Sequence, residues 1–337
     1  MRRHRELSSS KLDLVENFVK NFKKQGGKYE KHPVADSRIR DQLSGSEVPM
    51  MKREKAFSAN GFYMFVLESN IMLHRHAAAR GHKLLSDWCR RNWRNAPIKI
   101  LDLACGGTPY SIVRMMGACN QYKFSYTGID INPDQIEAAK ASWFPDNVVE
   151  TRLIEGNAWD LSMLPADEKF DIIFTGMNTH HGTPEEIYCL LLQVKERLAP
   201  GGIYINHDLF RPAGTPHLPR PDVNPDDPGE SFAMVAHETL AKYHASELAS
   251  PIKAEPNPRD WRERFLTKYK LALQERGAHE EGIREVVEHV SRRDYPISTK
   301  DLEAIAEQAG FVLSVLDMEA SGEPLEAYFS LVCAQPS

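Results

Sequence analysis

The amino-acid sequence predicts an α/β protein built on a doubly wound sheet of seven strands, mostly parallel, with the last strand antiparallel. From Ile98 onward, short apolar segments alternate with amphipathic helical stretches, which is the rhythm of a parallel sheet with crossover helices. These segments lack a strict polar alternation, as expected for strands covered by helices on both faces. The two final apolar segments are joined by a turn too short to hold a crossover helix, so we expect them to pair antiparallel.

Five expected strands precede residue 210 and two follow residue 298. They are the segments 98–104, 126–131, 151–156, 170–176, 202–208, 311–318 and 327–334. Capping residues mark helix starts between them: Asn132 and Thr183 each precede a proline and have Gln or Glu three residues further on. Ser298 is expected to cap a further helix with Asp301, three residues later.

Residues 1–95 are predicted to form an N-terminal helical region. A basic stretch to about Lys31 has the 3.6-residue periodicity of an amphipathic helix. Its apolar face consists of Leu12, Val15, Phe18, Val19 and Phe22. We expect this helix to pack on the domain, with a membrane-surface or partner-binding helix as the alternative. A second helical stretch runs from about Phe57 to Trp93 and is expected to break near Gly81.

The alternating pattern stops after Asp208. A proline-rich loop and helical segments from about Phe232 to Arg293 follow, which predicts a helical cap at 211–297, inserted beyond the carboxyl end of the fifth strand. The sheet then resumes. We therefore expect a core at 96–210 that is completed by a helix and two strands at 298–337.

Composition and charge exclude several classes of protein. The sequence has 42 Lys and Arg against 47 Asp and Glu, and this net charge of −5 argues against a large surface for nucleic acid. No apolar run reaches the roughly 18 residues of a spanning helix, and the N-terminal residues lack the apolar core of a secretory signal. A cytoplasmic protein is expected. The 5 scattered cysteines never form C-x-x-C, which disfavours disulfides and thiolate metal sites.

The stretch ILDLACGGTPYS, residues 100–111, predicts a strand that enters a glycine turn and then a helix near Tyr110. Gly106 and Gly107 leave backbone N–H groups open where Cβ atoms would otherwise collide with a ligand. The G-x-G-x-x-G spacing of dinucleotide sites is missing, so phosphate binding is disfavoured.

This turn resembles motif I of the class I S-adenosylmethionine (SAM) methyltransferases, in which an acid precedes alternating Gly or Ala positions. Asp102, Ala104 and Gly106 match the motif, and Thr108 stands where the last glycine is common. Asp130, at the end of GIDIN, resembles the acid that accepts hydrogen bonds from both ribose hydroxyls in that family.

The segment GNAWDL, residues 156–161, resembles the family's adenine site, with Asn157 in place of the usual acid. An amide oxygen still accepts a hydrogen bond from the adenine amine. The resemblance places the backbone N–H of Ala158 against the ring. For Trp159 two alternatives stay open, covering the adenine face or packing in the core.

Two later segments, TGMNTHHGTPEE and LAPGGIYINHD, resemble the small-molecule branch that includes ubiquinone and menaquinone C-methyltransferases. The resemblance covers about 98–208 and 298–334, and it implies a Rossmann-like core that binds SAM and releases S-adenosylhomocysteine (SAH). The residues that it places at the cofactor are Asp102, Ala104, Cys105, Gly106, Tyr110, Asp130, Ile131, Asn157, Ala158, Trp159 and Thr175.

Histidines follow the fourth and fifth strands, where the transferred methyl group would point. His181 and His180 are the first candidates to touch the substrate or act as a base, because imidazole titrates near neutral pH. His207 and Asp208 come next. These four side chains could converge on a metal, but no H-x-x-x-H or E-x-x-H spacing supports it, so no metal is predicted.

These features predict a SAM-dependent methyltransferase that transfers a methyl group to an O, N or C atom of a small molecule by in-line displacement. The alternatives are an RNA or protein methyltransferase, a SAM-binding regulator without turnover, and a non-methylating reaction of the sulfonium. Tyr29, Arg38 and Arg40 could close over the methionine end of the cofactor or remain solvent-exposed loop residues. A homodimer is compatible with the sequence.

Overall fold

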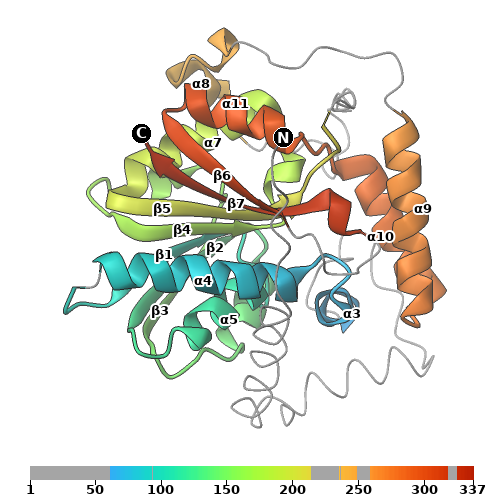
Figure 1. Cartoon of the computed structure of the whole chain (residues 1–337), viewed down its shortest axis with the longest axis horizontal. Helices are drawn as coiled ribbons and strands as arrows, with labels where there is room; N and C mark the ends of the chain where they lie inside the picture. The colour runs from blue at the N-terminus through green and yellow to red at the C-terminus, as the bar shows by residue number, and fades with distance from the viewer. Residues whose placement is uncertain (1–60, 93, 214–234, 236, 249–258, 318–324) are drawn as a thin grey trace, which may run out of the picture.

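The computed structural model describes residues 61–92, 94–213, 235, 237–248, 259–317 and 325–337. In this part of the chain, one seven-stranded sheet lies between two layers of helices (Figure 1). The strands are β1 Ile98–Leu103, β2 Phe124–Asp130, β3 Val148–Glu155, β4 Phe170–Gly176, β5 Leu198–Leu209, β6 Phe311–Asp317 and β7 Phe329–Pro336. The expected N-terminal basic helix, Tyr29, Arg38, Arg40 and most of the proline-rich loop lie outside the described residues.

The strand order is β3-β2-β1-β4-β5-β7-β6. Strands β1 to β5 pair in parallel, and β7 runs antiparallel to both of its neighbours, β5 and β6. The predicted doubly wound sheet with an antiparallel last strand is therefore confirmed. The strand order reverses between β1 and β4, so the connections that leave these two strands run in opposite directions. In open α/β sheets, ligands bind at the carboxyl ends of the strands at such a point.

The helices are α3 Gly61–Ser69, α4 His74–Asn92, α5 Tyr110–Ala118, α6 Pro133–Lys140, α7 Pro184–Arg197, α8 His237–Lys242, α9 Arg259–Glu275, α10 Glu280–Arg293 and α11 Thr299–Gln308. Thr183 and Ser298 each form the predicted capping box, with Glu186 and Asp301 respectively. Asn132 caps α6 by accepting a hydrogen bond from the backbone of Asp134.

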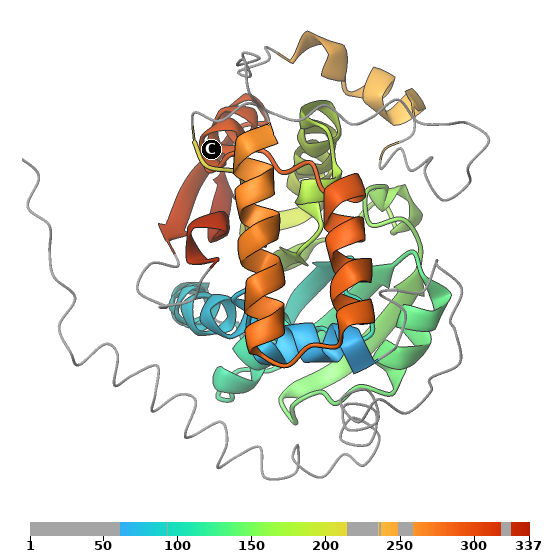
Figure 2. The same cartoon turned by 90° about the vertical axis from the view of Figure 1, so that its right-hand side faces the viewer.

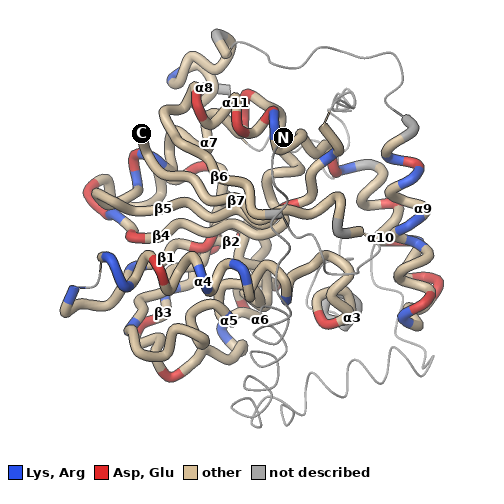
Figure 3. Tube along the Cα trace, viewed as in Figure 1, with Lys and Arg blue, Asp and Glu red and all other residues tan. Residues whose placement is uncertain are grey.

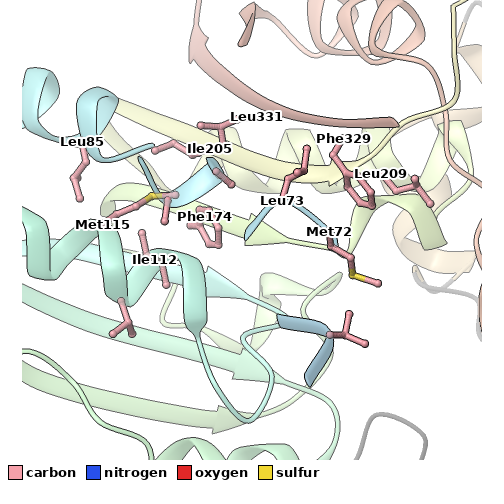
Figure 4. Close-up of a cluster of buried hydrophobic side chains, with 14 of the residues drawn as sticks. Met72, Leu73, Leu85, Ile112, Met115, Phe174, Ile205, Leu209, Phe329 and Leu331 are labelled. Atoms are coloured by element: carbon pink, nitrogen blue, oxygen red, sulfur yellow. The ribbon is translucent and has the colours of Figure 1, made fainter. Parts of the chain in front are cut away.

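Apolar side chains fill both sides of the sheet. On one side, Leu85 of α4 and Met115 of α5 pack against Phe174 and Ile205 of the central strands (Figure 4). Helices α7 and α11 cover the other side with a second apolar cluster. Each fully buried aliphatic side chain contributes roughly 1.5–3 kcal/mol to the free energy of folding. The two helix layers therefore stabilise the sheet whose carboxyl edge carries the candidate site.

The second N-terminal helix does not break at Gly81, and the prediction was wrong there. The break lies between α3 and α4, where Asn70 and Leu73 adopt left-handed φ values of 59° and 57°. Gly81 instead lies inside α4 against α5, where a Cβ would stand 2.3 Å from Cε of Met115. The missing side chain allows close helix packing, a contact between distant residues that local sequence does not reveal.

Helices α9 and α10 stand beside the carboxyl edge of the parallel strands (Figure 1), and the perpendicular view places them in front of that edge (Figure 2). They follow the fifth strand in the chain, as the predicted cap insertion does. The segment after α10 is tied to the edge, because the Tyr295 N–H donates to the His180 carbonyl at 2.7 Å. The domain boundaries proposed from the sequence stay predictions.

Lys and Arg are interspersed with Asp and Glu over the described residues, and α9 carries both signs along its length (Figure 3). Such mixed charge does not resemble the basic stripe of a nucleic-acid surface. None of the described helices has the length and apolar character needed to cross a membrane.

Candidate functional site

The turn after β1 exposes backbone at one point. Ala104 and Gly106 have left-handed φ values of 56° and 61°. Where a Cβ would stand on Gly106, no atom lies within 4 Å. A non-glycine residue in this conformation costs of order 1–3 kcal/mol, and such strain is concentrated at functional sites. The turn therefore presents bare backbone to open space at the carboxyl edge of the sheet.

Gly107 serves a different purpose from its neighbour. Its N–H donates to Oε1 of Gln135 at 2.5 Å, and a Cβ at this position would lie 2.8 Å from Cβ of Ala138. The sequence assigned Gln135 to helix capping. The structure instead uses its amide to fasten the turn to α6, because α6 packs directly beside the turn.

Two buried acids flank the turn. Asp130, at the end of β2, accepts hydrogen bonds from the N–H groups of Gly106 and Asn132, each at 2.9 Å. Burial raises the pKa of Asp130, and these two backbone donors oppose that shift. Asp102 accepts a hydrogen bond from the Tyr126 hydroxyl at 2.7 Å, and burial raises its pKa to about 8. Asp130 thus holds the turn from the end of β2, while Asp102 lies buried at the Tyr126 hydroxyl.

The predicted adenine site lies after β3. Asn157 accepts a hydrogen bond from the Trp159 N–H at 3.0 Å, and Ile131, the residue after β2, is 47% exposed. Trp159 is only 2% exposed and donates its indole N–H to Asn178. A Cβ on Gly182 would meet the Trp159 ring at 2.3 Å. Of the two open alternatives for Trp159, this structure shows core packing beneath the loop that follows β4.

The other residues predicted at the cofactor are buried. They are Cys105, Tyr110, Ala158 and Thr175. The Thr175 hydroxyl donates to the Leu103 carbonyl at 3.0 Å, which ties β4 to β1 at their carboxyl ends. The guanidinium of Arg114 stacks on the Tyr110 ring, with its carbon 3.4 Å from the ring centroid.

A buried acid orients the first histidine after β4. Nδ1 of His180 lies 2.5 Å from Oδ1 of Asp208. The other oxygen of Asp208 accepts hydrogen bonds from the backbone and the hydroxyl of Thr179. Burial favours the neutral acid, but the His180 charge and these hydrogen bonds prevail and lower the pKa of Asp208 to about 2. Burial likewise opposes the charge on His180, yet Asp294 and Asp208 raise its pKa to about 9.

Sequence reasoning missed Asp294, which completes this cluster from the end of α10. Its Oδ1 lies 3.5 Å from Nε2 of His180, 3.5 Å from Nδ1 of His181 and 3.6 Å from Nε2 of His289. Burial raises the pKa of Asp294 to about 6, although His180 and Arg262 oppose that shift. Neither Asp294 nor His289 belongs to a recognisable motif, so nothing in the local sequence signals their role.

His207 does not join this cluster. Consecutive residues of a strand point to opposite faces of the sheet, so His207 and Asp208 face different layers. His207 is fully buried and meets the His74 ring edge-on, with ring centroids 4.9 Å apart. Burial lowers the pKa of His207 to about 4. Of the four side chains that the sequence could have brought to one metal, the structure separates this one from His180 and His181.

Comparison with known proteins agrees with the expected core. Residues 100–202 match the family described as "Methyltransferase domain". The chain therefore resembles a methyltransferase domain over less than half of its length. It is also 30% identical over 115 residues to the uncharacterized methyltransferase sll0829 of Synechocystis sp., which amounts to 34% of this chain and 49% of that protein. The chain thus spans about half the length of this curated relative.

Two solved structures give weak structural matches. The DhpI–SAH complex is 13% identical, with a TM-score of 0.44, 89% of this chain and 97% of that chain being covered. The plantazolicin methyltransferase BamL, in complex with a triazolic desmethylPZN analog and SAH, is 12% identical, with a TM-score of 0.48 and coverage of 90% and 97%. The resemblance to the quinone-methylating branch stays a prediction.

Proposed function

We propose that the protein is a SAM-dependent methyltransferase that transfers the methyl group to an O, N or C atom of a small molecule by in-line displacement. The observation that carries this proposal is the open backbone at Gly106 beside the carboxylate of Asp130. A ligand with a diol and an extended polar chain can approach the backbone here, because no Cβ stands in the way.

The residues at this edge suit the adenosine part of SAM. Each oxygen of Asp130 accepts one backbone hydrogen bond, and a carboxylate has about four acceptor positions, so two ribose hydroxyls can still bind. The exposed Ile131 offers an apolar surface for a purine, and the amide of Asn157 offers an acceptor for its amine. Asp102 would support the site indirectly, by accepting the hydrogen bond from the Tyr126 hydroxyl.

The acceptor side lies after β4 and β5, under α9 and α10 (Figure 2). Helices that stand across the carboxyl edge favour a small enclosed acceptor over a long polymer. Methyl transfer from a sulfonium needs alignment more than bond activation, and positioning of this kind supplies roughly 7–11 kcal/mol. We place His181 and His180 at the acceptor, whereas His207 lies on the α4 side of β5. SAH is then the second product. The segments at the end of β4 and in β5 resemble those of the small-molecule branch that includes quinone C-methyltransferases.

Calorimetry with SAM and SAH tests this proposal. Asp130→Ala should weaken SAH binding by roughly ten- to hundredfold, since a hydrogen bond to a charged group contributes about 1.5–3 kcal/mol. Asp146→Ala, which removes an exposed acid, is the matched control and should bind SAH normally. If the unmodified protein gives no heat with either ligand, the proposal is wrong.

Turnover separates the remaining alternatives. Metabolite extracts incubated with isotopically labelled SAM should yield a labelled small product and SAH by mass spectrometry. Label recovered only in RNA or protein would replace the small-molecule assignment, and binding without SAH formation would indicate a regulator. Light scattering of the purified protein tests the homodimer, and fractionation of cells tests the cytoplasmic location.

A further inference from the structure

We propose that His180, His181 and Asp294 form a binding site for a first-row divalent transition-metal ion, with His289 as a further nitrogen beside it. Among the described residues, one ligand atom from each of the first three lies within 4.8 Å of the others. Metal binding goes beyond the proposed methyl transfer and does not depend on it.

The distances around Asp294 fit a coordination shell better than a set of hydrogen bonds. Its Oδ1 lies 3.5–3.6 Å from three imidazole nitrogens, longer than the roughly 2.7–3.2 Å of a nitrogen–oxygen hydrogen bond. In a tetrahedral site with metal–ligand distances of about 2.0–2.2 Å, neighbouring ligand atoms stand roughly 3.3–3.6 Å apart. The distance from the Asp294 oxygen to each of these nitrogens therefore equals the distance between two ligand atoms of one metal ion.

Asp294 also leaves a polar atom to be satisfied. The residue is 3% exposed, and its Oδ1 accepts no hydrogen bond from the described residues. A buried acceptor without a partner costs about 1–3 kcal/mol, and more if it is charged. A cation held between this oxygen and the facing imidazoles removes that cost.

The partners behind the imidazoles resemble the outer shell of a metal site. Nδ1 of His180 faces Asp208, so Nε2 is the nitrogen directed toward Asp294. Asp208 is fixed in turn by Thr179. Nδ1 of His181 lies 3.1 Å from the Arg293 carbonyl, and this nitrogen gives up that hydrogen bond when it binds an ion. A carboxylate partner such as Asp208 orients a metal-binding histidine, and loss of such a partner typically weakens metal binding by about 10- to 100-fold.

The ligand types select the class of ion. Imidazole suits zinc, iron, cobalt, nickel and copper, whereas magnesium and calcium prefer oxygen ligands. Two imidazoles and one carboxylate leave open coordination positions. The side chains of His181 and His289 are 23% and 20% exposed, so an ion can enter from the cap side. If the proposed methyl transfer is correct, an ion here would lower the pKa of an acceptor hydroxyl or thiol.

Zn(II) and Co(II) are the probes for the test. The full chain is stripped with a chelator, dialysed, and titrated with Zn(II) by calorimetry and with Co(II) by visible absorption. We expect one ion per chain and a Co(II) spectrum of low coordination number. Asp294→Asn and His181→Gln should each weaken Zn(II) binding by at least about tenfold.

His279→Asn is the matched control, because it changes an exposed histidine at the start of α10 to another capping residue. Thermal unfolding and SAH binding are measured on every variant, so a folding defect and a failure of the proposed methyl transfer are each recognised separately. If Asp294→Asn does not fold, the test rests on Zn(II) binding by His181→Gln, which changes a partly exposed side chain. Equal Zn(II) affinity in the site and control variants, or no stoichiometric binding by the folded chain, overturns the proposal.

Discussion

Replacing Gly106 with Ala should reduce stability and cofactor affinity through two separable effects. The backbone at Gly106 has a φ of 61°, and a left-handed conformation costs an L-residue roughly 1–2 kcal/mol. No atom lies within 4 Å of the added Cβ, so no steric clash adds to this cost. We therefore expect the free energy of unfolding in urea to fall by about 1–2 kcal/mol.

The same methyl group should interfere with the ligand. It would occupy the open space in which we place SAM, so the closest approach between ligand and backbone is lost. A loss of about 1.4–2.8 kcal/mol corresponds to a ten- to hundredfold rise in the Kd for SAH. Isothermal titration of the Ala variant with SAH measures this change directly, and urea unfolding of the same sample measures the stability.

Gly277 provides a matched control within the chain. It has a φ of 79°, lies between α9 and α10, and also has nothing within 4 Å of an added Cβ. Gly277→Ala should therefore lose a similar free energy of unfolding and bind SAH as the unmodified protein does. If the two variants show the same SAH affinity, the turn after β1 does not hold the cofactor and the reasoning fails.

Two further predictions concern packing and pH. Gly81→Ala should destabilise the protein by about 1–3 kcal/mol, because its Cβ would overlap the Met115 side chain. In a Met115→Ala background the added cost should be much smaller in urea unfolding; equal costs in both backgrounds would refute this packing. Asp102 has a pKa of about 8 when folded and 3.8 ordinarily, so between these values the folded state holds a proton that the unfolded chain has released. Its contribution to stability is therefore present at low pH and lost as pH rises from about 4 to 8, by up to about 1.4 kcal/mol per unit, and Asp102→Asn should flatten this slope in urea unfolding.

The predictable parts of the fold rest on local physical rules. The capping pairs at 183 and 298 set helix starts where expected, because a hydroxyl and an acid three residues apart each accept a hydrogen bond from the backbone N–H of the other residue. The glycine turn and the acid at the end of β2 were predicted at the same edge, and the Gly106 N–H does donate to Asp130. Parallel strands bring their carboxyl ends together, so chain order alone placed these residues near each other.

The sequence by itself determined the order of strands and helices, the turn after β1 and the two histidines after β4. Each depends on residues within a few positions of one another or on the connectivity of parallel strands. Only the tertiary structure decided that Asp294, 114 residues beyond His180, faces the histidine pair and that His207 faces away from it. The physical reason is that side-chain contacts between the cap and the sheet depend on helix packing angles and strand pleat, and neither leaves a periodic pattern in the sequence.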